Sequence, residues 1–385
     1  MLKQILHFLL IVNGTISVYS QSDSLSKFKN HKLVIGGDSN LVFSGTRIIT
    51  KTDTARNHKI ELSGYVSAYY ANYSDETVVN GFVQFPTMAP RNKQFGLNLA
   101  QIGMEYHDQK VRGNITLQYG DIPESNWPKP FTLIQEAHAG IQLIKKLWLD
   151  AGFFKSHIGL ESTQPRENVT SSMSVIDYFE PYYFSGAKLT YQVNTKLTLQ
   201  LNVFNGYNTY VETNKNKAIG FSALYDFNDY ISVTYNLLSC DETLDQIKTK
   251  HQRLYHNLYA TIKVKKFSLG VEANYGTQKN SLLIDTTKTA STNSALMVLK
   301  YQIFKKIGLY GRAEYFSDKN KILTNHIFLG DNIYGGTIGI EFKPEKNVAV
   351  SIEHRTLQCD AFIFKEKNYF TNQRRELIFC LDVWF

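Results

Sequence analysis

The sequence contains few prolines and cysteines, and it lacks a continuous apolar stretch of bilayer-spanning length. Only 8 of the 385 residues are Pro, and the 3 cysteines, Cys240, Cys359 and Cys380, are widely spaced. An odd number of cysteines without a C-x-x-C spacing cannot form a complete disulfide framework. A helix needs ~20 apolar residues to cross a bilayer, and no segment of the mature chain provides them. If the chain lies in a membrane, it must therefore cross it as strands.

The sequence also lacks a segregated basic region. The formal net charge is +8, from 42 Lys and Arg against 34 Asp and Glu. A basic chain binds nucleic acid when its Lys and Arg gather in an arm or patch. Here the basic residues are scattered among acidic ones, so we expect no nucleic-acid partner.

Catalytic and metal-binding motifs are absent as well. Ser156 and His157 are adjacent, but neighbours on a strand point to opposite faces, and neither G-x-S-x-G nor H-x-x-E-H occurs. His251 and His256 have no zinc-like companion, and the Gly-Gly-Asp stretch at 36–38 is too short a signal for phosphate binding. We therefore expect no enzymatic activity, no metal and no cofactor.

What the N-terminus does contain is the pattern of a secretory signal peptide. Lys3 precedes an apolar core at residues 5–18, which ends shortly before Gln21. A basic start followed by a short apolar core and a cleavage site is typical of exported chains. A single-span anchor is the alternative, but the core is too short to span a bilayer. We predict that residues 1–20 are a cleaved signal peptide.

From about residue 60, apolar side chains recur at every second position, which is the period of a strand with two different faces. In the clearest segment, 111–119, one face carries Val111, Ile115 and Leu117, whereas Arg112 lies on the other. A membrane strand needs only one apolar face, so the chain can be polar overall. Sixteen segments follow this pattern: 60–70, 95–106, 111–119, 133–143, 147–154, 184–193, 197–206, 218–227, 230–239, 253–264, 267–277, 294–303, 307–316, 333–342, 348–358 and 375–385. The second changes phase along its length, which predicts a β-bulge.

The connections between these segments alternate strictly between short and long. The short turns are 107–110, 144–146, 194–196, 228–229, 265–266, 304–306 and 343–347. The longer polar stretches are 71–94, 120–132, 155–183, 207–217, 240–252, 278–293, 317–332 and 359–374. Such alternation is typical of outer-membrane barrels, which have short periplasmic turns, long external loops and an even strand count. We predict an all-β fold in which residues 60–385 form a transmembrane antiparallel up-and-down β-barrel of about sixteen strands.

The polar faces and the longest loop supply the candidate pore residues. Loop 155–183 carries several charges and could fold inward as a constriction or pack as an external loop on the rim. The pore-lining or constriction candidates are Arg112, Glu136, Asp150, Lys155, His157, Glu161, Lys188, Lys263, Glu272, Lys300, Arg312, Glu314 and Arg355. Charges of both signs favour weak ion selectivity, and many of them could simply pair across strands and stiffen the wall.

Three stretches are especially specific, namely Trp-Leu-Asp-Ala-Gly at 148–152, Ser-His-Ile-Gly at 156–159 and Ser-Gly-Ala-Lys at 185–188. Together with several others, they resemble the OmpL-like putative β-barrel porin family, known mainly from Bacteroidota-type outer membranes. The resemblance covers most of 62–385 and implies a porin-like barrel. The chain departs from this pattern in its long lead. We expect residues 21–59 to form an N-terminal periplasmic or plug segment, and an added strand is a further interpretation.

Taken together, the pattern and the resemblance predict an integral outer-membrane porin of a Gram-negative bacterium. Small hydrophilic solutes or ions would diffuse passively through its aqueous lumen. The alternatives are an adhesin-like barrel whose external loops bind a surface partner and, less favoured, an outer-membrane hydrolase. The expected partners are outer-membrane lipids and lipopolysaccharide, the solutes themselves and, because the terminal Phe385 resembles an assembly signal, the barrel-assembly machinery. By analogy with porins of this size, the barrel could form a homotrimer.

Overall fold

The computed structural model describes residues 48–53, 58–75, 78–79, 82–83, 87–324 and 332–385. The chain divides into residues 1–33, which lie outside the described ranges, and residues 34–385, which contain every described element. The signal peptide expected at 1–20 and most of the lead at 21–59 therefore lie outside the described residues.

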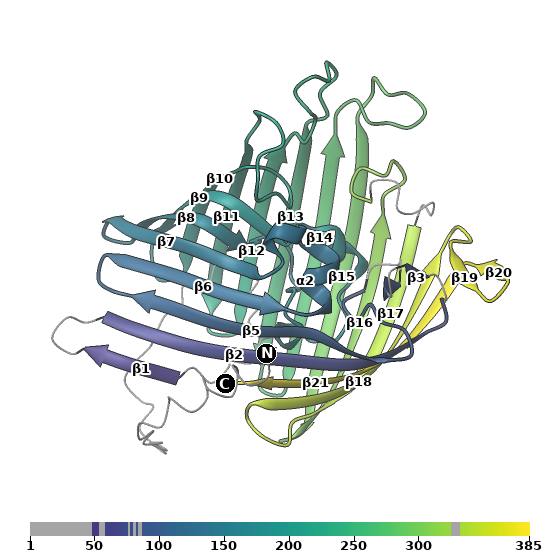
Figure 1. The fold of residues 1–385 in the computed structure, drawn as a ribbon, viewed down its shortest axis with the longest axis horizontal. Coiled ribbons are helices and arrows are strands. Elements are labelled where there is room, and N and C mark those ends of the chain that lie inside the picture. The colour runs from purple at the N-terminus through teal and green to yellow at the C-terminus, as the bar shows by residue number, and fades with distance from the viewer. Residues whose placement is uncertain (1–47, 54–57, 76–77, 80–81, 84–86, 325–331) are drawn as a thin grey trace. The chain divides into compact units, whose positions relative to one another are not determined.

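Sixteen antiparallel strands form one closed sheet. Each strand pairs with the next along the chain, and the last pairs with the first from Tyr65↔Trp384 to Tyr73↔Glu376. Figure 1 shows β2 and β21 side by side where the sheet closes. The strands are β2 (His58–Tyr73), β5 (Phe95–His107), β6 (Val111–Tyr119), β7 (Ile134–Ile144), β8 (Leu147–Lys155), β9 (Tyr183–Gln192), β10 (Leu197–Phe204), β11 (Ala218–Asn228), β12 (Ile231–Cys240), β13 (Arg253–Val264), β14 (Phe267–Gln278), β15 (Ala290–Phe304), β16 (Ile307–Ser317), β17 (Asn332–Phe342), β18 (Val348–Cys359) and β21 (Gln373–Trp384). The predicted fold class and all sixteen predicted strands are confirmed.

One further strand, β1 (Ile48–Asp53), belongs to the lead and pairs with the start of β2, from Ile48↔Leu62 to Asp53↔His58. β1 pairs with the part of β2 that precedes Tyr65, where the pairing of β2 with β21 begins. This part of the lead is thus an added strand, but it extends the sheet beside the ring and leaves the count of sixteen unchanged.

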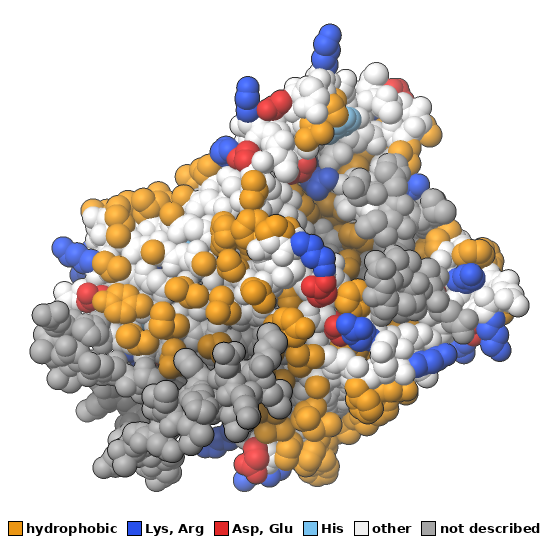
Figure 2. All heavy atoms as spheres, in the orientation of Figure 1, with side chains coloured by type: hydrophobic (Ala, Val, Ile, Leu, Met, Phe, Trp, Pro, Cys, Tyr) orange, Lys and Arg blue, Asp and Glu red, His pale blue; other side chains and the backbone are white. Residues whose placement is uncertain are grey.

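The strand faces have opposite chemistry. On β6, Val111, Ile115 and Leu117 are about half exposed, whereas Gln118 is buried. Figure 2 shows hydrophobic side chains spread over the visible outer face of the strands. An exposed apolar exterior around a polar interior is the inverse of a water-soluble barrel, and it suits a wall that faces lipid outside and water inside. Within the described residues, no helix has the length and apolar character needed to cross a membrane.

The β-bulge predicted in the second strand is present in β5. Ser67 pairs with Leu99 and Ala68 pairs with Leu97, which leaves Asn98 as the extra residue. Asn98 and Leu99 are consequently both buried. The bulge turns Leu99 inward. The apolar side chains therefore change face just before Leu99, whereas the sequence pattern indicates a change just after it.

The connections also have the predicted alternation. The short turns between β7 and β8 and between β13 and β14 each contain a lysine with positive φ, 69° at Lys146 and 51° at Lys265. The long connections carry the remaining elements, which are β3 (Val78–Val79), β4 (Phe82–Val83), α2 (Asp121–Asn126), η1 (Lys129–Phe131), η2 (Pro165–Glu167), α3 (Val175–Phe179), β19 (Phe364–Glu366) and β20 (Tyr369–Thr371).

Candidate functional site in the barrel interior

The connection between β8 and β9, residues 156–182, runs through the interior of the barrel. We call it the inner loop. The backbone amide of Arg166 donates a hydrogen bond to the Tyr65 hydroxyl on β2 at 3.2 Å. The amide of Leu160 donates to Glu272 Oε2 on β14 at 2.8 Å. A loop that rested on the rim could not reach inward-facing side chains on strands so far apart in the ring, so the structure places this segment inside.

Local sequence signals shape the inner loop. The 3₁₀ turn η2 begins with Pro165, whose fixed φ and missing N–H suit the first position of a helical turn. Helix α3 is capped by Ser174, whose hydroxyl accepts a hydrogen bond from Asp177 N at 3.2 Å. Gly159 adopts φ +99°, a conformation that favours glycine. These residues let the chain reverse direction within a narrow space.

Helix α3 is also anchored by apolar packing on the inner wall. The Phe179 ring stacks on Phe316 of β16 with ring centroids 5.5 Å apart. The other buried members of this cluster are Val175, Ile176, Ile333, Leu357, Cys359 and Phe364. In addition, the amide of Val175 donates to Glu314 Oε2 at 2.7 Å. Burial of this helix face, at roughly 25 cal/mol per Å² of apolar surface, holds the inner loop against β16 to β18.

The inward face of β16, β18 and β21 carries a chain of alternating charges, which we call the ionic wall. Its members are Arg312, Glu314, Glu353, Arg355, Arg374 and Glu376, all of them buried. Arg355 Nη2 lies 2.8 Å from Glu314 Oε1, and Arg312 Nη1 lies 2.9 Å from Glu161 Oε1 in the inner loop. Most of these charges therefore compensate one another.

Two long loops attach to the ionic wall. In the inner loop, the amide of Ser171 donates to Glu353 Oε2 at 2.7 Å and that of Ser172 donates to Glu353 Oε1 at 3.2 Å. In the β2–β5 loop, Asp75 Oδ2 lies 3.0 Å from Arg374 Nη1. Charge-assisted hydrogen bonds of this kind are stronger than neutral ones, so the wall orders both loops.

The opposite part of the interior, on β10 to β14, is lined by neutral amides, which we call the amide wall. Its members are Gln200, Asn202, Asn236, Asn257 and Asn274, all buried. Asn236 Nδ2 donates to Asn257 Oδ1 at 2.7 Å, and Asn257 Nδ2 donates to Asn274 Oδ1 at 2.6 Å. Apart from Glu272 on β14, which accepts a hydrogen bond from Asn257, this side is neutral, so the two walls give the lumen one charged side and one mainly neutral, hydrogen-bonding side.

A third group of charges lies on β6 to β9. Arg112 donates two hydrogen bonds to the Asp150 carboxylate, one of them from Nε to Oδ1 at 2.6 Å. A Cβ at Gly140 would lie 2.1 Å from Asp150 Oδ1, so glycine leaves the room that this pair occupies. Lys188 Nζ lies 3.9 Å from the centroid of the Phe154 ring, a cation–π geometry.

The remaining candidates lie at the base of the inner loop and near the short turns. Glu136 Oε1 accepts a hydrogen bond from Lys155 N at 3.1 Å. Near the short turns, Lys300 Nζ lies 2.8 Å from Glu341 Oε1, whereas Lys263 is exposed. Lys263 thus stands apart from the residues that surround the inner loop.

His157, at the start of the inner loop, is buried between aromatic rings. Its ring centroid lies 5.5 Å from that of Phe184 and 5.9 Å from that of Phe204. Burial, and then the charge of Lys188, lowers the pKa of His157 to about 3. Its Nε2 lies 3.4 Å from Asn202 Nδ2 on the amide wall. At neutral pH His157 is therefore an uncharged packing residue.

Ser156, considered beside His157 as a nucleophile–base pair, has other partners. Its hydroxyl accepts a hydrogen bond from Ile158 N at 3.0 Å. Within the described residues, no hydrogen bond joins Ser156 to His157. Nucleophilic catalysis needs the base within hydrogen-bond reach of the hydroxyl, so this geometry gives the hydrolase interpretation no support.

The structure brings most of the predicted site residues into two groups. One surrounds the inner loop and contains Lys155, His157, Glu161, Glu272, Arg312, Glu314 and Arg355, and the other contains Arg112, Glu136, Asp150 and Lys188. The sequence reasoning missed Asp75, Glu180, Arg374 and Glu376 among the charged interior residues. The inward position of Glu376 could have been predicted from strict alternation in the last strand, because its neighbours Arg375 and Leu377 point outward.

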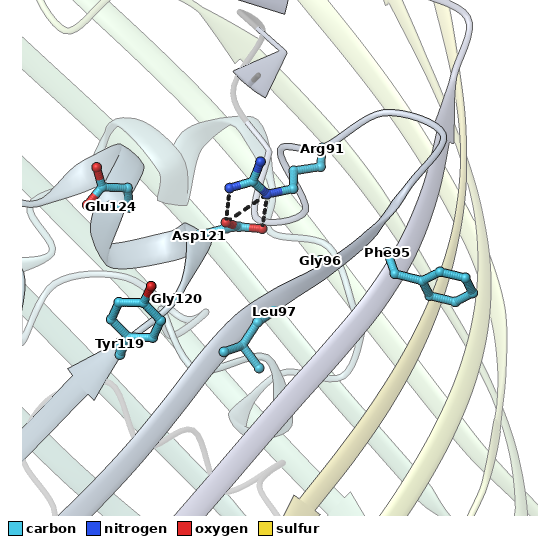
Figure 3. Close-up of a pocket in the computed structure, with 8 residues that line it drawn as sticks. All are labelled: Arg91, Phe95, Gly96, Leu97, Tyr119, Gly120, Asp121 and Glu124. Carbon is cyan, nitrogen blue, oxygen red and sulfur yellow. Dashed lines mark hydrogen bonds and ion pairs between the residues drawn. The ribbon is translucent and has the colours of Figure 1, made fainter. Parts of the chain in front are cut away.

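A separate pocket of about 380 Å³ lies at the long-loop end, beside β5, β6 and α2. In Figure 3, the Arg91 guanidinium faces the Asp121 carboxylate, and Phe95 points away from them. Arg91 Nε lies 2.9 Å from Asp121 Oδ2, which also accepts a hydrogen bond from the Tyr69 hydroxyl at 2.8 Å. None of the predicted site residues lines this pocket. Asp121 thus joins the β2–β5 and β6–β7 loops to strand β2.

A closed sheet with an apolar exterior, a polar interior and alternating short turns and long loops defines a transmembrane β-barrel of the outer-membrane class. The model of the family described as putative beta-barrel porin-2, OmpL-like, matches residues 59–385. The chain belongs to this family and is an outer-membrane porin. No curated protein sequence matches the chain.

Solved structures with a similar fold are also outer-membrane proteins. The outer membrane channel DcaP of Acinetobacter baumannii is 11% identical with a TM-score of 0.60, over 88% of this chain and 100% of that one. An anion-selective porin from Comamonas acidovorans is 11% identical with a TM-score of 0.57, over 85% and 100% of the two chains. A trimer form of OmpT from Vibrio cholerae is 9% identical with a TM-score of 0.52, over 85% and 99%. At such identities the similarity shows a shared fold.

Proposed function

We propose that this porin lets small hydrophilic solutes and ions diffuse passively through its lumen, and that the inner loop forms the narrowest part of the path. The observation that carries this proposal is the attachment of the inner loop to inward-facing side chains on both sides of the ring, at Tyr65 and at Glu272. A loop held at both sides narrows the lumen without depending on the external loops. The predicted site residues that surround the inner loop would shape this constriction.

The constriction would select weakly between anions and cations. Rings of one charge select ions of the other sign, but the interior charges are largely paired. Arg112 pairs with Asp150, and Arg355 pairs with Glu314. Paired charges leave a small net field in the path, and the amide wall adds no charge to it. A channel of this kind needs no catalytic group, and we propose a transport role rather than an enzymatic one.

Conductance of the refolded mature protein in a planar lipid bilayer tests the proposal. We expect discrete current steps and a small reversal potential across a salt gradient. A variant that lacks residues 163–175 should conduct more, because it loses the centre of the inner loop. The matched control lacks residues 245–249 of the exposed β12–β13 connection and should conduct like the wild type.

Each result has a clear meaning. Unchanged conductance after removal of 163–175 would contradict the constriction. The absence of current steps from a protein with the circular dichroism of a folded barrel would overturn the channel proposal. It would favour a barrel whose external loops bind a surface partner.

We further propose the cellular setting that the sequence predicts. Residues 1–20 would direct export in a Gram-negative bacterium of the Bacteroidota type, and the barrel-assembly machinery would insert the chain among outer-membrane lipids and lipopolysaccharide. The trimer form of the similar OmpT supports a homotrimer. Mass spectrometry of the mature N-terminus and light scattering of the detergent-solubilised protein test these two points, and an intact residue 1 or a monomeric mass would contradict them.

A further inference from the structure

Three carboxylates meet in the interior where the inner loop touches β14. Asp177 lies in α3, Glu180 follows α3 directly, and Glu272 projects from β14. One oxygen atom of each lies within 4.8 Å of the others. All three side chains are buried, with exposed fractions of 2%, 1% and 4%. Among the described residues, no Lys or Arg forms an ion pair with any of them.

The hydrogen bonds of these carboxylates leave one oxygen without a partner. Glu272 accepts from Leu160 N at 2.8 Å and from Asn257 Nδ2 at 2.7 Å. Glu180 Oε1 accepts from the Tyr255 hydroxyl at 2.7 Å. Glu180 Oε2, although buried, has no hydrogen-bond partner within the described part of the chain. A buried carboxylate oxygen without a partner is costly, which indicates that something else satisfies it.

The unpartnered oxygen lies close against Gly159. A Cβ built on Gly159 would lie 2.4 Å from Glu180 Oε2 and 2.7 Å from Asp177 Oδ1. Both oxygens therefore face the point where any other residue would place its side chain. The backbone of Gly159, at φ +99°, also favours glycine. The inner loop thus keeps a side chain out of the place where the two carboxylates converge.

Three buried carboxylates at this separation cannot all be ionised without a compensating positive charge. Burial, followed by the neighbouring carboxylates, raises the pKa of both Asp177 and Glu180. Two means of compensation exist, which are protons shared among the acids or a bound cation. Either one would satisfy Glu180 Oε2, but a single divalent cation compensates two negative charges at once, whereas each proton compensates one.

The donor set identifies the class of cation. All the available ligands are hard oxygen atoms, which suit Ca²⁺ and Mg²⁺ rather than the softer metals that prefer nitrogen or sulfur. Ca²⁺ accepts six to eight oxygens in irregular geometry, whereas Mg²⁺ requires a near-ideal octahedron. We propose that Asp177, Glu180 and Glu272 form a Ca²⁺-binding site that ties the inner loop to β14. This site goes beyond the porin function, since it assigns a structural ion to the barrel interior.

Calcium titration of the refolded full-length barrel tests the proposal. The protein is prepared in detergent without lipopolysaccharide, treated with EDTA, dialysed and titrated with CaCl₂ by isothermal calorimetry. We expect one Ca²⁺ per chain and a higher Tm in its presence. Glu180→Gln should weaken binding by at least about tenfold, because it removes a charged ligand. The control Glu136→Gln changes an interior carboxylate outside the cluster and should bind like the wild type.

A second readout uses the wild-type protein alone, so it holds even if a variant fails to fold. The Tyr255 hydroxyl lies 2.7 Å from Glu180 Oε1, so Tb³⁺ bound at the site should show tyrosine-sensitised emission that CaCl₂ abolishes. Saturable binding that Glu180→Gln leaves unchanged would place the ion elsewhere and overturn the proposal. The absence of saturable Ca²⁺ binding would favour shared protons and overturn it as well. Calcium binding is measured without any current, so this result can be interpreted even if the channel proposal fails.

Discussion

Arg312 on β16 and Glu161 in the inner loop lie 151 residues apart in the sequence, yet Arg312 Nη1 donates a hydrogen bond to Glu161 Oε1 at 2.9 Å. The same guanidinium donates to the backbone oxygens of Ser172 at 2.7 Å and Met173 at 3.3 Å. It is completely buried. One side chain of the wall therefore holds two separate stretches of the inner loop.

Replacement of Arg312 by Gln should release the inner loop. Loss of one partner leaves the Glu161 carboxylate buried without its main counter-charge, and breaking a buried pair in this way costs about 3–5 kcal/mol. We expect lower stability in micelles and larger current fluctuations within the open state. Thermal unfolding and single-channel recordings measure the two effects.

The matched control is Arg112→Gln. Arg112 pairs with Asp150, and both residues belong to strands of the wall. The control should also lose stability, but the fluctuations of its open-state current should be no larger than those of the wild type. Equal current noise in both variants would show that Arg312 does not restrain the inner loop.

Two paired glycines lie three residue pairs before the inner loop leaves the sheet. Gly152 on β8 pairs with Gly186 on β9. Gly152 has φ +135°, and a Cβ there would lie 2.3 Å from the backbone oxygen of Ala137 on the adjacent strand. Gly152→Ala should cost more than about 3 kcal/mol, because it combines backbone strain with a clash that a strand cannot relieve. Refolding yield and urea unfolding measure this loss.

Gly336 on β17 provides the control for that substitution. A Cβ at Gly336 would meet no atom within 4 Å, and Ala restricts the unfolded chain more than Gly does. Gly336→Ala should therefore be neutral or slightly stabilising. If both alanine variants refold like the wild type, close strand approach at Gly152 is not what requires glycine.

The strands could be predicted because each one carries its evidence locally. On β6, the outward Val111 and the inward Gln118 differ in polarity since one faces lipid and the other faces the lumen. The predicted strand bounds are least accurate where a strand extends beyond the part of the barrel that carries apolar side chains on its outer face. β15 begins at Ala290, four residues before the predicted start at 294, because its first residues, Ala-Ser-Thr-Asn, lack an apolar face.

The interior site could be predicted only in part, because its contacts join residues that are distant in the sequence. Alternation indicates that Arg312 points inward, but it says nothing of the Glu161 that binds it. Such tertiary contacts set the course of the inner loop. The sequence alone therefore did not decide whether this loop folds into the lumen or packs externally on the rim. Glu180 was missed for the same reason, since only the folded loop brings it to Asp177 and Glu272.

The terminal residue closes the ring. Phe385 N donates to Gly64 O at 3.0 Å, Gly64 N donates to Phe385 O at 2.9 Å, and the Phe385 ring covers Gly64. An aromatic ring over a strand glycine shields its backbone. Phe385→Ala should slow assembly of the barrel in cells and cost roughly 1–2 kcal/mol in micelles. Phe370→Ala, which removes an exposed ring from β20, should do neither, and equal assembly of both variants would contradict a special role for Phe385.

His157 should make the porin sensitive to acid. Its pKa in the folded protein is lowered to about 3 by burial and then by Lys188, whereas an unfolded His titrates near 6.5. Between these values the unfolded chain binds a proton that the folded chain does not. The contribution of neutral His157 to stability is therefore complete above pH ~6.5 and falls by about 1.4 kcal/mol per pH unit below it.

The comparison of wild type with His157→Asn isolates this contribution, because other buried groups act in the opposite direction. In protein free of Ca²⁺, the raised pKa values of Asp177 and Glu180 mean that the folded state takes up protons on these acids first, so they favour the folded state as the pH falls. Asn keeps a hydrogen-bonding group near Asn202 but cannot be protonated. The free energy of unfolding of the wild type, measured in micelles from pH 7.5 to 4.5, should therefore fall more steeply than that of the variant. Parallel curves would mean that His157 becomes protonated without loss of the fold, and its place between Phe184 and Phe204 would then have to admit a charge.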